Sequence, residues 1–386
     1  MKKFKTIIGM WMALSVTMLA GCVEEFEANV GNEPIEGLVI EGDIISDSTV
    51  VFNLNRKLPL TFTGENELFY DSYMDVDAEL CIYGSDGTFW PGQALGKGQY
   101  RVEIGTLNPD VEYHLEVEYE GDTYQSDPQK PLETIAIENL TFSQPDLEGP
   151  VIVQLDAKEG SADDSKYYLW YFEEDWELRA EYVTNVLYDE EYNRIVRYEY
   201  PPVAQGWCYH VTDQYVLGST ESLVKNQIVG KTLHTIGNTD NRLSVLYSIR
   251  VYQRSLTQRE HEYYQIRAKL NKEMGGLFTP QPSELPSNIT CSNPKRKAIG
   301  YVGCNMTVAQ RQLYIPTEEV AYVNEMDCAF GQEPGGGNRD KFKAGFQTCD
   351  DTPTWAKGEC VDVTWLNADP QGRPAWWPNP YLYYKE

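Results

Sequence analysis

The stretch Tyr113-His114-Leu115-Glu116-Val117-Glu118-Tyr119 alternates apolar and polar side chains, which is the period of a β-strand with one buried face. Glu120-Gly121-Asp122 follows as a tight turn, and Thr123-Tyr124-Gln125-Ser126 then resumes the strand-like pattern. Two such strands joined by so short a turn predict an antiparallel hairpin. This hairpin indicates that the surrounding part of the chain folds as β-sheet.

The same signals recur on both sides of the hairpin, from residue 37 to residue 132. Short strand-like runs occupy Leu38–Gly42, Thr49–Leu54, Ala78–Tyr83 and Tyr100–Ile104. Turn residues such as Ser85-Asp86-Gly87 separate them. Several short strands at this spacing predict an immunoglobulin-like β-sandwich over residues 37–132.

A second β-rich domain is predicted for residues 133–330, after a boundary at Pro128–Pro131. Its expected strands are Ile135–Phe142, Val151–Leu155, Lys166–Trp176, Tyr182–Tyr200 and Leu243–Gln253. One amphipathic helix is expected near residues 257–274, because Ser255 or Thr257 can cap it, Glu260 lies three positions after Thr257 as in a capping box, and Gly275-Gly276 ends the pattern. Its buried stripe is expected at Tyr263, Ile266 and Leu270. Residues 331–386 read as an irregular tail rich in Gly, Pro and Trp that packs on the second domain. The predicted fold class is therefore mainly β.

The N-terminus has the layout of a bacterial export signal. Three lysines, Lys2, Lys3 and Lys5, precede an apolar run over residues 7–20 that is too short to span a bilayer. The run ends in Leu19-Ala20-Gly21-Cys22, which resembles a lipobox. That resemblance implies removal of residues 1–21 and acylation of Cys22, giving attachment to the membrane through lipid. The alternative is an ordinary signal, or a buried helix that happens to end in Gly-Cys.

An acidic tether is expected over residues 22–36, directly after the lipidated cysteine. Glu24, Glu25, Phe26 and Glu27 resemble the short tag that directs lipoproteins of Bacteroidota to the outer face of the outer membrane. The alternative is a solvated segment without an address, which would leave the protein on the periplasmic leaflet. We expect a lipid-anchored outer-membrane protein at the cell surface.

The charge balance excludes some partners. The chain has 59 Asp and Glu against 32 Lys and Arg, a formal net charge of −27, and loss of the three signal lysines makes this −30. Such a charge repels nucleic acid, so no nucleic-acid partner is expected. The 27 tyrosines suit the surface of a β-sandwich, or alternatively a face that contacts a ligand.

Eight cysteines are present, and Cys22 is assigned to lipid. Six others are candidates for disulfides in an oxidising compartment: Cys208, Cys291, Cys304, Cys328, Cys349 and Cys360. Cys291 and Cys304 flank a turn at Asn293-Pro294-Lys295 and are expected to face each other across a hairpin. Cys81 is the expected buried free thiol. The sequence leaves the connectivity open.

No catalytic or metal motif is found. The four histidines have no metal-ligand spacing, and no Gly-x-Ser-x-Gly, phosphate-loop, dinucleotide-binding or EF-hand pattern occurs. Carboxylates such as Glu173-Glu174-Asp175 are close in sequence, as 59 acids make inevitable. We therefore expect no enzyme, no catalytic residues, no metal and no cofactor; a hydrolase that uses acidic residues is the weakest hypothesis.

The order of several motifs resembles the domain of unknown function 4249 family of Bacteroidota lipoproteins. The matching segments are Tyr247–Thr257, the helix bearing Tyr263-Tyr264, Gly275–Pro282, Ser287–Ile289, Ile299–Tyr301, Trp207–Tyr209 and Gly372–Pro378. The chain departs from the family pattern at Cys349 and Cys360, which lie farther apart than the family's paired cysteines. For the central block we favour the interpretation that it is a corner that only determines the fold, because Gly and Pro fix backbone geometry first.

No activity is established for the family, but the resemblance implies a function. Members of the family accompany TonB-dependent outer-membrane receptors, so the leading hypothesis is a binding or lid accessory subunit of such a nutrient transporter. The ligand class, whether small molecule, peptide or glycan, stays open. The alternative is a stand-alone glycan-binding or adhesive surface lipoprotein, in which Trp376 and Trp377 stack on sugars.

Overall fold

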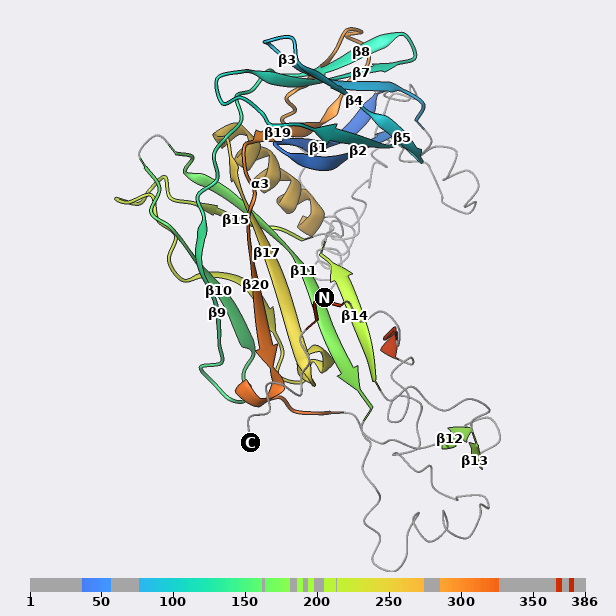
Figure 1. Cartoon of the computed structure of the whole chain (residues 1–386), viewed down its shortest axis with the longest axis vertical. Coiled ribbons are helices and arrows are strands. Elements are labelled where there is room, and N and C mark those ends of the chain that lie inside the picture. Colours follow the sequence, from blue (N-terminus) through green and yellow to red (C-terminus); the bar gives the residue numbers. More distant parts are fainter. Residues whose placement is uncertain are drawn as a thin grey trace, which may run out of the picture.

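The computed structural model describes residues 37–56, 76–161, 164–180, 186–189, 194–197, 205–212, 214–273, 285–325, 366–369 and 375–377. Two β-sandwiches follow each other along the long axis of the molecule, and helix α3 (Gln258–Glu273) lies at their junction (Figure 1). The mainly β class predicted from the sequence is confirmed.

The first sandwich consists of sheets A and B, each with five strands. Sheet A has the order β19 (Ile299–Asn305), β1 (Leu38–Ile45), β2 (Ser48–Arg56), β6 (Gln99–Ile104) and β5 (Gln93–Gly96). Sheet B has the order β18 (Ile289–Cys291), β8 (Asp122–Ser126), β7 (Tyr113–Tyr119), β3 (Glu79–Gly84) and β4 (Phe89–Pro91). The hairpin predicted at residues 113–126 is confirmed as β7 and β8. The inward side chains of both sheets, Ile40 and Phe52 facing Leu115 and Val117 among them, form one buried core.

Strands β18 and β19 reach the first sandwich from late in the chain, which differs from the predicted division at residue 132. β19 lies parallel to β1 through seven residue pairs, and β18 pairs antiparallel with β8. Residues 289–305 therefore complete the first sandwich and are not part of the second. A strand's own periodicity shows which of its faces is buried but not which distant strand it pairs with.

The backbones of β19 and β1 approach each other so closely at Gly300 that this position requires glycine. Its φ is +134°, and a Cβ atom built there would lie 1.9 Å from the carbonyl oxygen of Ile40 on β1. Only a residue without a side chain permits this approach of the two backbones. The motif Ile299-Gly300-Tyr301 is thus a pairing site between strands that are 260 residues apart in the sequence.

The second sandwich consists of sheets C and D. Sheet C has the order β16 (Lys231–Ile236), β10 (Val151–Ala157) and β9 (Ile137–Ser143). Sheet D has the order β14 (Gln205–Val211), β11 (Tyr167–Arg179), β17 (Leu246–Leu256) and β20 (Ala309–Pro316), and β15 (Val216–Ser219) also pairs with β11. Short 3-10 turns, η1 (Asn241–Leu243) and η2 (Thr317–Glu319), lie beside them. Val153 and Leu155 of sheet C pack against Trp170 and Tyr247 of sheet D in its core.

The single long strand expected at Tyr182–Tyr200 is wrong. The described parts of this segment form β12 (Val186–Asp189) and β13 (Arg194–Arg197), which pair antiparallel with each other. Antiparallel pairing of two consecutive segments requires the chain to reverse between them, so one continuous strand is impossible.

Helix α3 is confirmed, and it begins as predicted. The Thr257 hydroxyl accepts a hydrogen bond from the Glu260 backbone N–H at 3.1 Å, which caps the first turn. Of the stripe expected at Tyr263, Ile266 and Leu270, only Tyr263 is buried and the other two are half-buried. The polar residues Glu260 and His261 are buried as well. The described ranges contain no helix with both the length and the apolar character needed to cross a membrane.

A buried ionic cluster joins the helix to both sandwiches. Arg254, at the end of β17, forms ion pairs with Asp43 of β1 and with Glu260 of α3. Burial raises the pKa of the Glu260 carboxyl above its ordinary value, and the Arg254 charge opposes that rise. Around this cluster, Arg267 of α3 lies 2.8 Å from Glu41 of β1. The junction is therefore a packed and charged interface between the two sandwiches.

Candidate functional site

Sheet D has one face in the core and one face turned away from sheet C. Tyr168, Trp170 and Phe172 of β11 lie in the core shared with sheet C. Because successive side chains of a strand point to opposite faces, Tyr171, Glu173 and Asp175 lie on the outer face. The sheet therefore carries a row of aromatic and acidic side chains on the side away from its own core.

The neighbouring strands extend this row, because residues paired across a ladder share a face. On β17, Tyr252 pairs with Tyr171 and Arg250 with Glu173. On β14, Tyr209 pairs with Asp175, and Trp207 pairs with the next outward residue. We call the following set the aromatic face: Tyr171, Glu173, Asp175, Trp207, Tyr209, Arg250, Tyr252 and Trp376.

Ring stacking and hydrogen bonds hold the β11 and β17 side of this face. The rings of Tyr171 and Tyr252 are stacked, with centroids 4.9 Å apart and an interplanar angle of 10°. The Tyr252 hydroxyl donates to Glu173 Oε2 at 3.0 Å, and Arg250 Nη1 lies 3.5 Å from the same oxygen. These contacts fix the positions of the two tyrosine rings and of the guanidinium.

The β14 side presents two further aromatic rings. Trp207 and Tyr209 are stacked, with centroids 5.9 Å apart and 13° between their planes. Tyr209 is 50% exposed, so one face of its ring is open to solvent. The Trp207 backbone exchanges hydrogen bonds with Asp369, which attaches a described part of the C-terminal tail to this edge of sheet D.

Trp376 and Trp377 of the tail both reach the aromatic face but differ in role. Trp377 is 5% exposed, and its indole N–H donates to Glu177 Oε2 at 3.1 Å. Trp376 is 46% exposed, and the Arg250 guanidinium lies 5.2 Å from the centroid of its ring. Of the two predicted stacking residues, Trp377 is therefore a buried anchor and Trp376 offers an open ring.

The electrostatics of the face centre on Asp175. Its side chain is only 2% exposed, and burial raises the pKa of its carboxyl to about 6, against the opposing effect of Arg250. Burial, together with the charges of Glu173 and Asp175, also raises the pKa of the Tyr209 hydroxyl. The Tyr209 hydroxyl therefore stays protonated at neutral pH.

A second buried carboxylate lies on the core side of β11, and its role is structural. Glu174 accepts a hydrogen bond from the Tyr247 hydroxyl at 2.7 Å and forms an ion pair with Arg242. Burial alone would raise the pKa of Glu174, but His234, Tyr247 and Arg242 outweigh it and hold that pKa below its ordinary value. Its partners satisfy this carboxylate within the fold.

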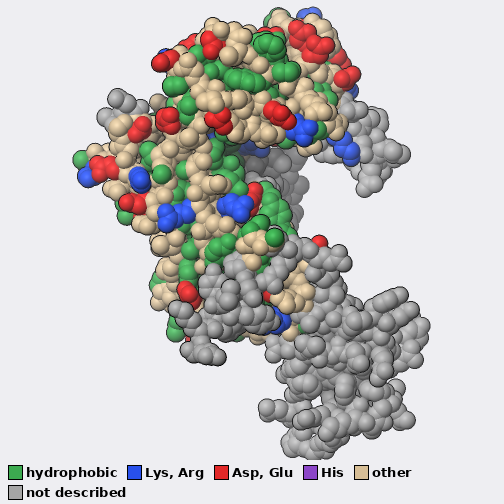
Figure 2. Space-filling view, viewed as in Figure 1, with side chains coloured by type: hydrophobic (Ala, Val, Ile, Leu, Met, Phe, Trp, Pro, Cys, Tyr) green, Lys and Arg blue, Asp and Glu red, His purple; other side chains and the backbone are tan. Residues whose placement is uncertain are grey.

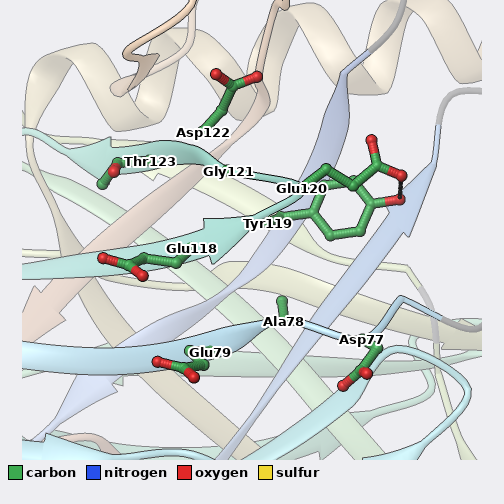
Figure 3. A pocket seen from close by; sticks show the side chains of 9 residues that line it. All are labelled: Asp77, Ala78, Glu79, Glu118, Tyr119, Glu120, Gly121, Asp122 and Thr123. Carbon is green, nitrogen blue, oxygen red and sulfur yellow. Dashed lines mark hydrogen bonds between the residues drawn. The ribbon is translucent and has the colours of Figure 1, made fainter.

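The first sandwich carries an acidic hollow of about 380 Å³. Figure 2 shows Asp and Glu side chains spread over the surface of this sandwich, and Figure 3 shows Glu79 and Glu118 beside each other at the hollow. Arg296 pairs with two more of its carboxylates, Glu120 at 2.9 Å and Asp122 at 3.1 Å. Within the described ranges, no group of three or more His, Cys, Asp or Glu side chains is arranged to hold a metal ion.

The cysteines differ from the predicted pairing. Cys291 lies on β18 of sheet B and Cys304 on β19 of sheet A, and both are free thiols, as is Cys208. The hairpin expected between Cys291 and Cys304 does not form because each segment pairs with a different distant strand. Three further candidates, Cys328, Cys349 and Cys360, lie outside the described residues, as do Cys22 and the tag residues Glu24, Glu25, Phe26 and Glu27.

Of the residues of the aromatic face, the sequence assigned a ligand-contacting role only to Trp376, although Trp207 and Tyr209 lie in a segment that matches the family. Glu173 and Asp175 were noted only as part of a chance cluster of acids. One signal was available in the strand itself, which has a period of two. One of its faces carries aromatic residues (Trp170, Phe172 and Trp176), and the other carries an aromatic residue and acids (Tyr171, Glu173, Asp175 and Glu177). Which residues of β14 and β17 join the aromatic face depends on the register of these strands against β11. The alternation within β11 does not determine that register.

Comparison with known proteins places the chain in a family. No curated protein matches it. Among solved structures, it is similar to a segment of two fibronectin type-III domains from chicken tenascin, with 10% identity over 57% of this chain and 92% of that chain. The TM-score of that likeness is 0.15, which supports no conclusion about this chain. The family model described as a domain of unknown function (DUF4249) matches residues 23–311. The chain therefore belongs to the DUF4249 family.

Proposed function

We propose that this protein is an outer-membrane lipoprotein, anchored through Cys22 and exposed at the cell surface, that acts as a binding or lid subunit of a TonB-dependent nutrient transporter. The anchor rests on the export signal and on the lipobox-like Leu19-Ala20-Gly21-Cys22. The surface address rests on the acidic residues that follow Cys22. The transporter partnership rests on the resemblance of the chain to lipoproteins that accompany such receptors.

The aromatic face is the observation that best supports a binding role. Tyr209 and Trp376 present open rings beside the charged Arg250 and Glu173. Open aromatic rings next to fixed polar groups are typical of recognition surfaces, because the rings bury large areas at small cost in side-chain entropy. Such a face suits a protein that captures a ligand, and we propose a binding protein rather than an enzyme.

The packed and charged junction supports a lid role in particular. Arg254 joins β17 to β1 and α3 through ion pairs with Asp43 and Glu260, so buried contacts connect the first sandwich with the sheet that carries the aromatic face. A lid must hold the surface that covers the transporter in a fixed position relative to its membrane anchor. Flexible linkage between the sandwiches would not do this.

The proposal is tested by comparing wild type with Cys22→Ser in the native host. Wild type should incorporate an alkyne-labelled fatty acid, fractionate with the outer membrane and be cleaved by protease added to whole cells. After extraction in mild detergent it should bring a TonB-dependent receptor with it. Cys22→Ser should lose the label and the membrane fraction. Recovery of wild type unlabelled, or labelled but always without a receptor, would contradict the proposal; the second outcome would favour the stand-alone adhesive lipoprotein.

A further inference from the structure

The ionic cluster at the junction contains one positive charge and two carboxylates. Arg254 of β17 forms ion pairs with Asp43 of β1 and with Glu260 of α3. The side chains of Arg254 and Glu260 are 3% and 1% exposed, so water screens these charges little. If both carboxylates were ionised, the cluster would hold an uncompensated negative charge inside the protein. A carboxylate in such a place takes up a proton rather than stay charged.

Glu260 is the carboxyl that suits this proton. Asp43 is 24% exposed and accepts a hydrogen bond from the Gly303 backbone N–H at 3.1 Å, so both water and a backbone donor solvate its charge. Glu260 has almost no contact with water. Burial raises the pKa of its carboxyl above the ordinary value, and the charge of Arg254 and the Thr257 backbone N–H only partly oppose that rise. The proton is therefore expected on Glu260.

The other titratable groups around the cluster do not change charge near neutral pH. Burial raises the pKa of the Tyr264 hydroxyl, which accepts a hydrogen bond from Arg254 at 3.2 Å. Burial also raises the pKa of Tyr171 on β11 and of Cys304 on β19 to about 12, and it raises the pKa of Tyr301 on β19. These four groups therefore stay protonated and neutral, while the Arg254 guanidinium keeps its positive charge.

The remaining charged side chains of α3 near the cluster have partners of their own. Arg267 lies 2.8 Å from Glu41 of β1, and Arg259 lies 2.6 Å from Asp127. His261 is buried, and burial lowers the pKa of its imidazole, so the ring is neutral at neutral pH. These side chains therefore supply no second positive charge to the cluster.

We propose that Glu260 holds a proton near neutral pH and that this proton controls how tightly the two sandwiches are joined. With Glu260 protonated, the charges of Arg254 and Asp43 balance each other. When Glu260 releases the proton to solvent, one buried negative charge is left at the junction, which favours separation of α3 from β1 so that water reaches the cluster. The junction is therefore tighter at pH 5 than at pH 8. This inference goes beyond the proposed function, since it depends on neither the receptor nor the ligand.

Hydrogen–deuterium exchange of the full protein in mild detergent tests the inference at pH 5 and pH 8, with intrinsic exchange rates corrected for pH. Peptides from β1 and from the first turns of α3 report on the junction, and a peptide from β10 is the reference. In wild type, protection of the junction should fall at least about tenfold from pH 5 to pH 8, because a carboxyl pKa that folding raises by one unit changes the folding equilibrium about tenfold. Protection of β10 should fall less.

Three variants assign the effect to the cluster. Glu260→Gln has a neutral side chain at every pH, so its junction should be as protected at pH 8 as at pH 5. Asp43→Asn removes one of the two negative charges, so its junction should also lose most of the pH response. Glu262→Gln neutralises an exposed carboxylate of the same helix and is the matched control, which should respond to pH as wild type does. Infrared difference spectra between the two pH values should show a protonated carboxyl band in wild type that Glu260→Gln lacks.

Several outcomes would overturn the inference. These are wild-type protection of the junction that is equal at the two pH values or greater at pH 8, the same pH response in wild type and Glu260→Gln, and a fall in β10 protection as large as that of the junction. If Glu260→Gln does not fold, the comparison of wild type with Asp43→Asn and Glu262→Gln decides in the same way. Co-purification with a receptor tests the proposed function separately, because it does not depend on this proton.

Discussion

The guanidinium of Arg254 lies 2.7 Å from the carboxylate of Glu260, and both side chains are almost completely buried. Arg254 shares its charge with Asp43, so one cation serves two carboxylates from distant parts of the chain. Gly303 of β19 closes the cluster, because its backbone N–H donates to Asp43 at 3.1 Å. The junction therefore depends on four segments that fold together.

Gly303→Ala is predicted to destabilise the protein by about 1–3 kcal/mol, because an added methyl group overpacks the ionic cluster. A Cβ atom there would lie 2.6 Å from Glu260 Oε1 and 2.8 Å from Asp43 Oδ1. Urea unfolding measures the change. Gly237→Ala is the control, since nothing lies within 4 Å of its Cβ position, and it should change stability little. Equal stability of the two variants would contradict the cluster's packing.

The neighbouring tryptophans of the tail are predicted to respond differently to substitution. Trp377→Phe removes the donor to the buried Glu177 carboxylate and should cost about 1–3 kcal/mol of unfolding free energy. Trp376→Phe keeps an exposed ring and should change stability by less than about 0.5 kcal/mol. Thermal melts of both variants measure the difference. A larger loss for Trp376→Phe would reverse the roles assigned to them.

Because the Asp175 carboxyl is buried, we expect the stability of the protein to depend on pH. The pKa of its carboxyl is about 6 in the folded protein against 3.8 in the unfolded chain, so between these values the folded state retains a proton that the unfolded state has lost. Stability should therefore fall as pH rises from about 4 to about 6, by about 1–3 kcal/mol. Asp175→Asn should lack this contribution. The difference in unfolding free energy between wild type and variant, measured at pH 4 and pH 7, isolates it; a constant difference would contradict the burial of this carboxylate.

The free thiols predict a pattern of alkylation. Burial raises the pKa of Cys304 to about 12 and that of Cys208 to about 11, and the thiolate is the reactive form. Iodoacetamide at pH 8 should leave both unmodified in the folded protein. After unfolding in urea without reductant, peptide mass spectrometry should find both alkylated. Alkylation that requires a reductant would show instead that these cysteines are in disulfides.

Local patterns predicted the elements that depend on neighbours in the sequence. The hairpin of β7 and β8 followed from the alternation around Glu120-Gly121-Asp122. The start of α3 followed from two candidate caps, Ser255 and Thr257, of which Thr257 is the one that caps the helix. Both depend on residues within about ten positions of each other. Their physical cause is therefore contained in a short window of sequence.

Long-range pairing accounts for what could not be predicted. β19 joins β1 across about 260 residues, and no property of Ile299–Asn305 alone identifies that partner. The pairing of Asp175 with Tyr209 and the burial of Asp175 follow from the register of three strands. An acidic residue in an aromatic strand is predicted to be exposed to solvent, unless the residues that pack around it in the fold are known.

The most direct test of the account is photo-crosslinking on intact cells of the native host. A benzophenone amino acid is placed at Tyr209, on the aromatic face, or at Val51, which is 41% exposed on β2 of the first sandwich. The account predicts that position 209 crosslinks to a TonB-dependent receptor or to its nutrient, and that position 51 does not. Crosslinks from position 51 alone, or none from position 209 in protein that has reached the cell surface, would contradict it.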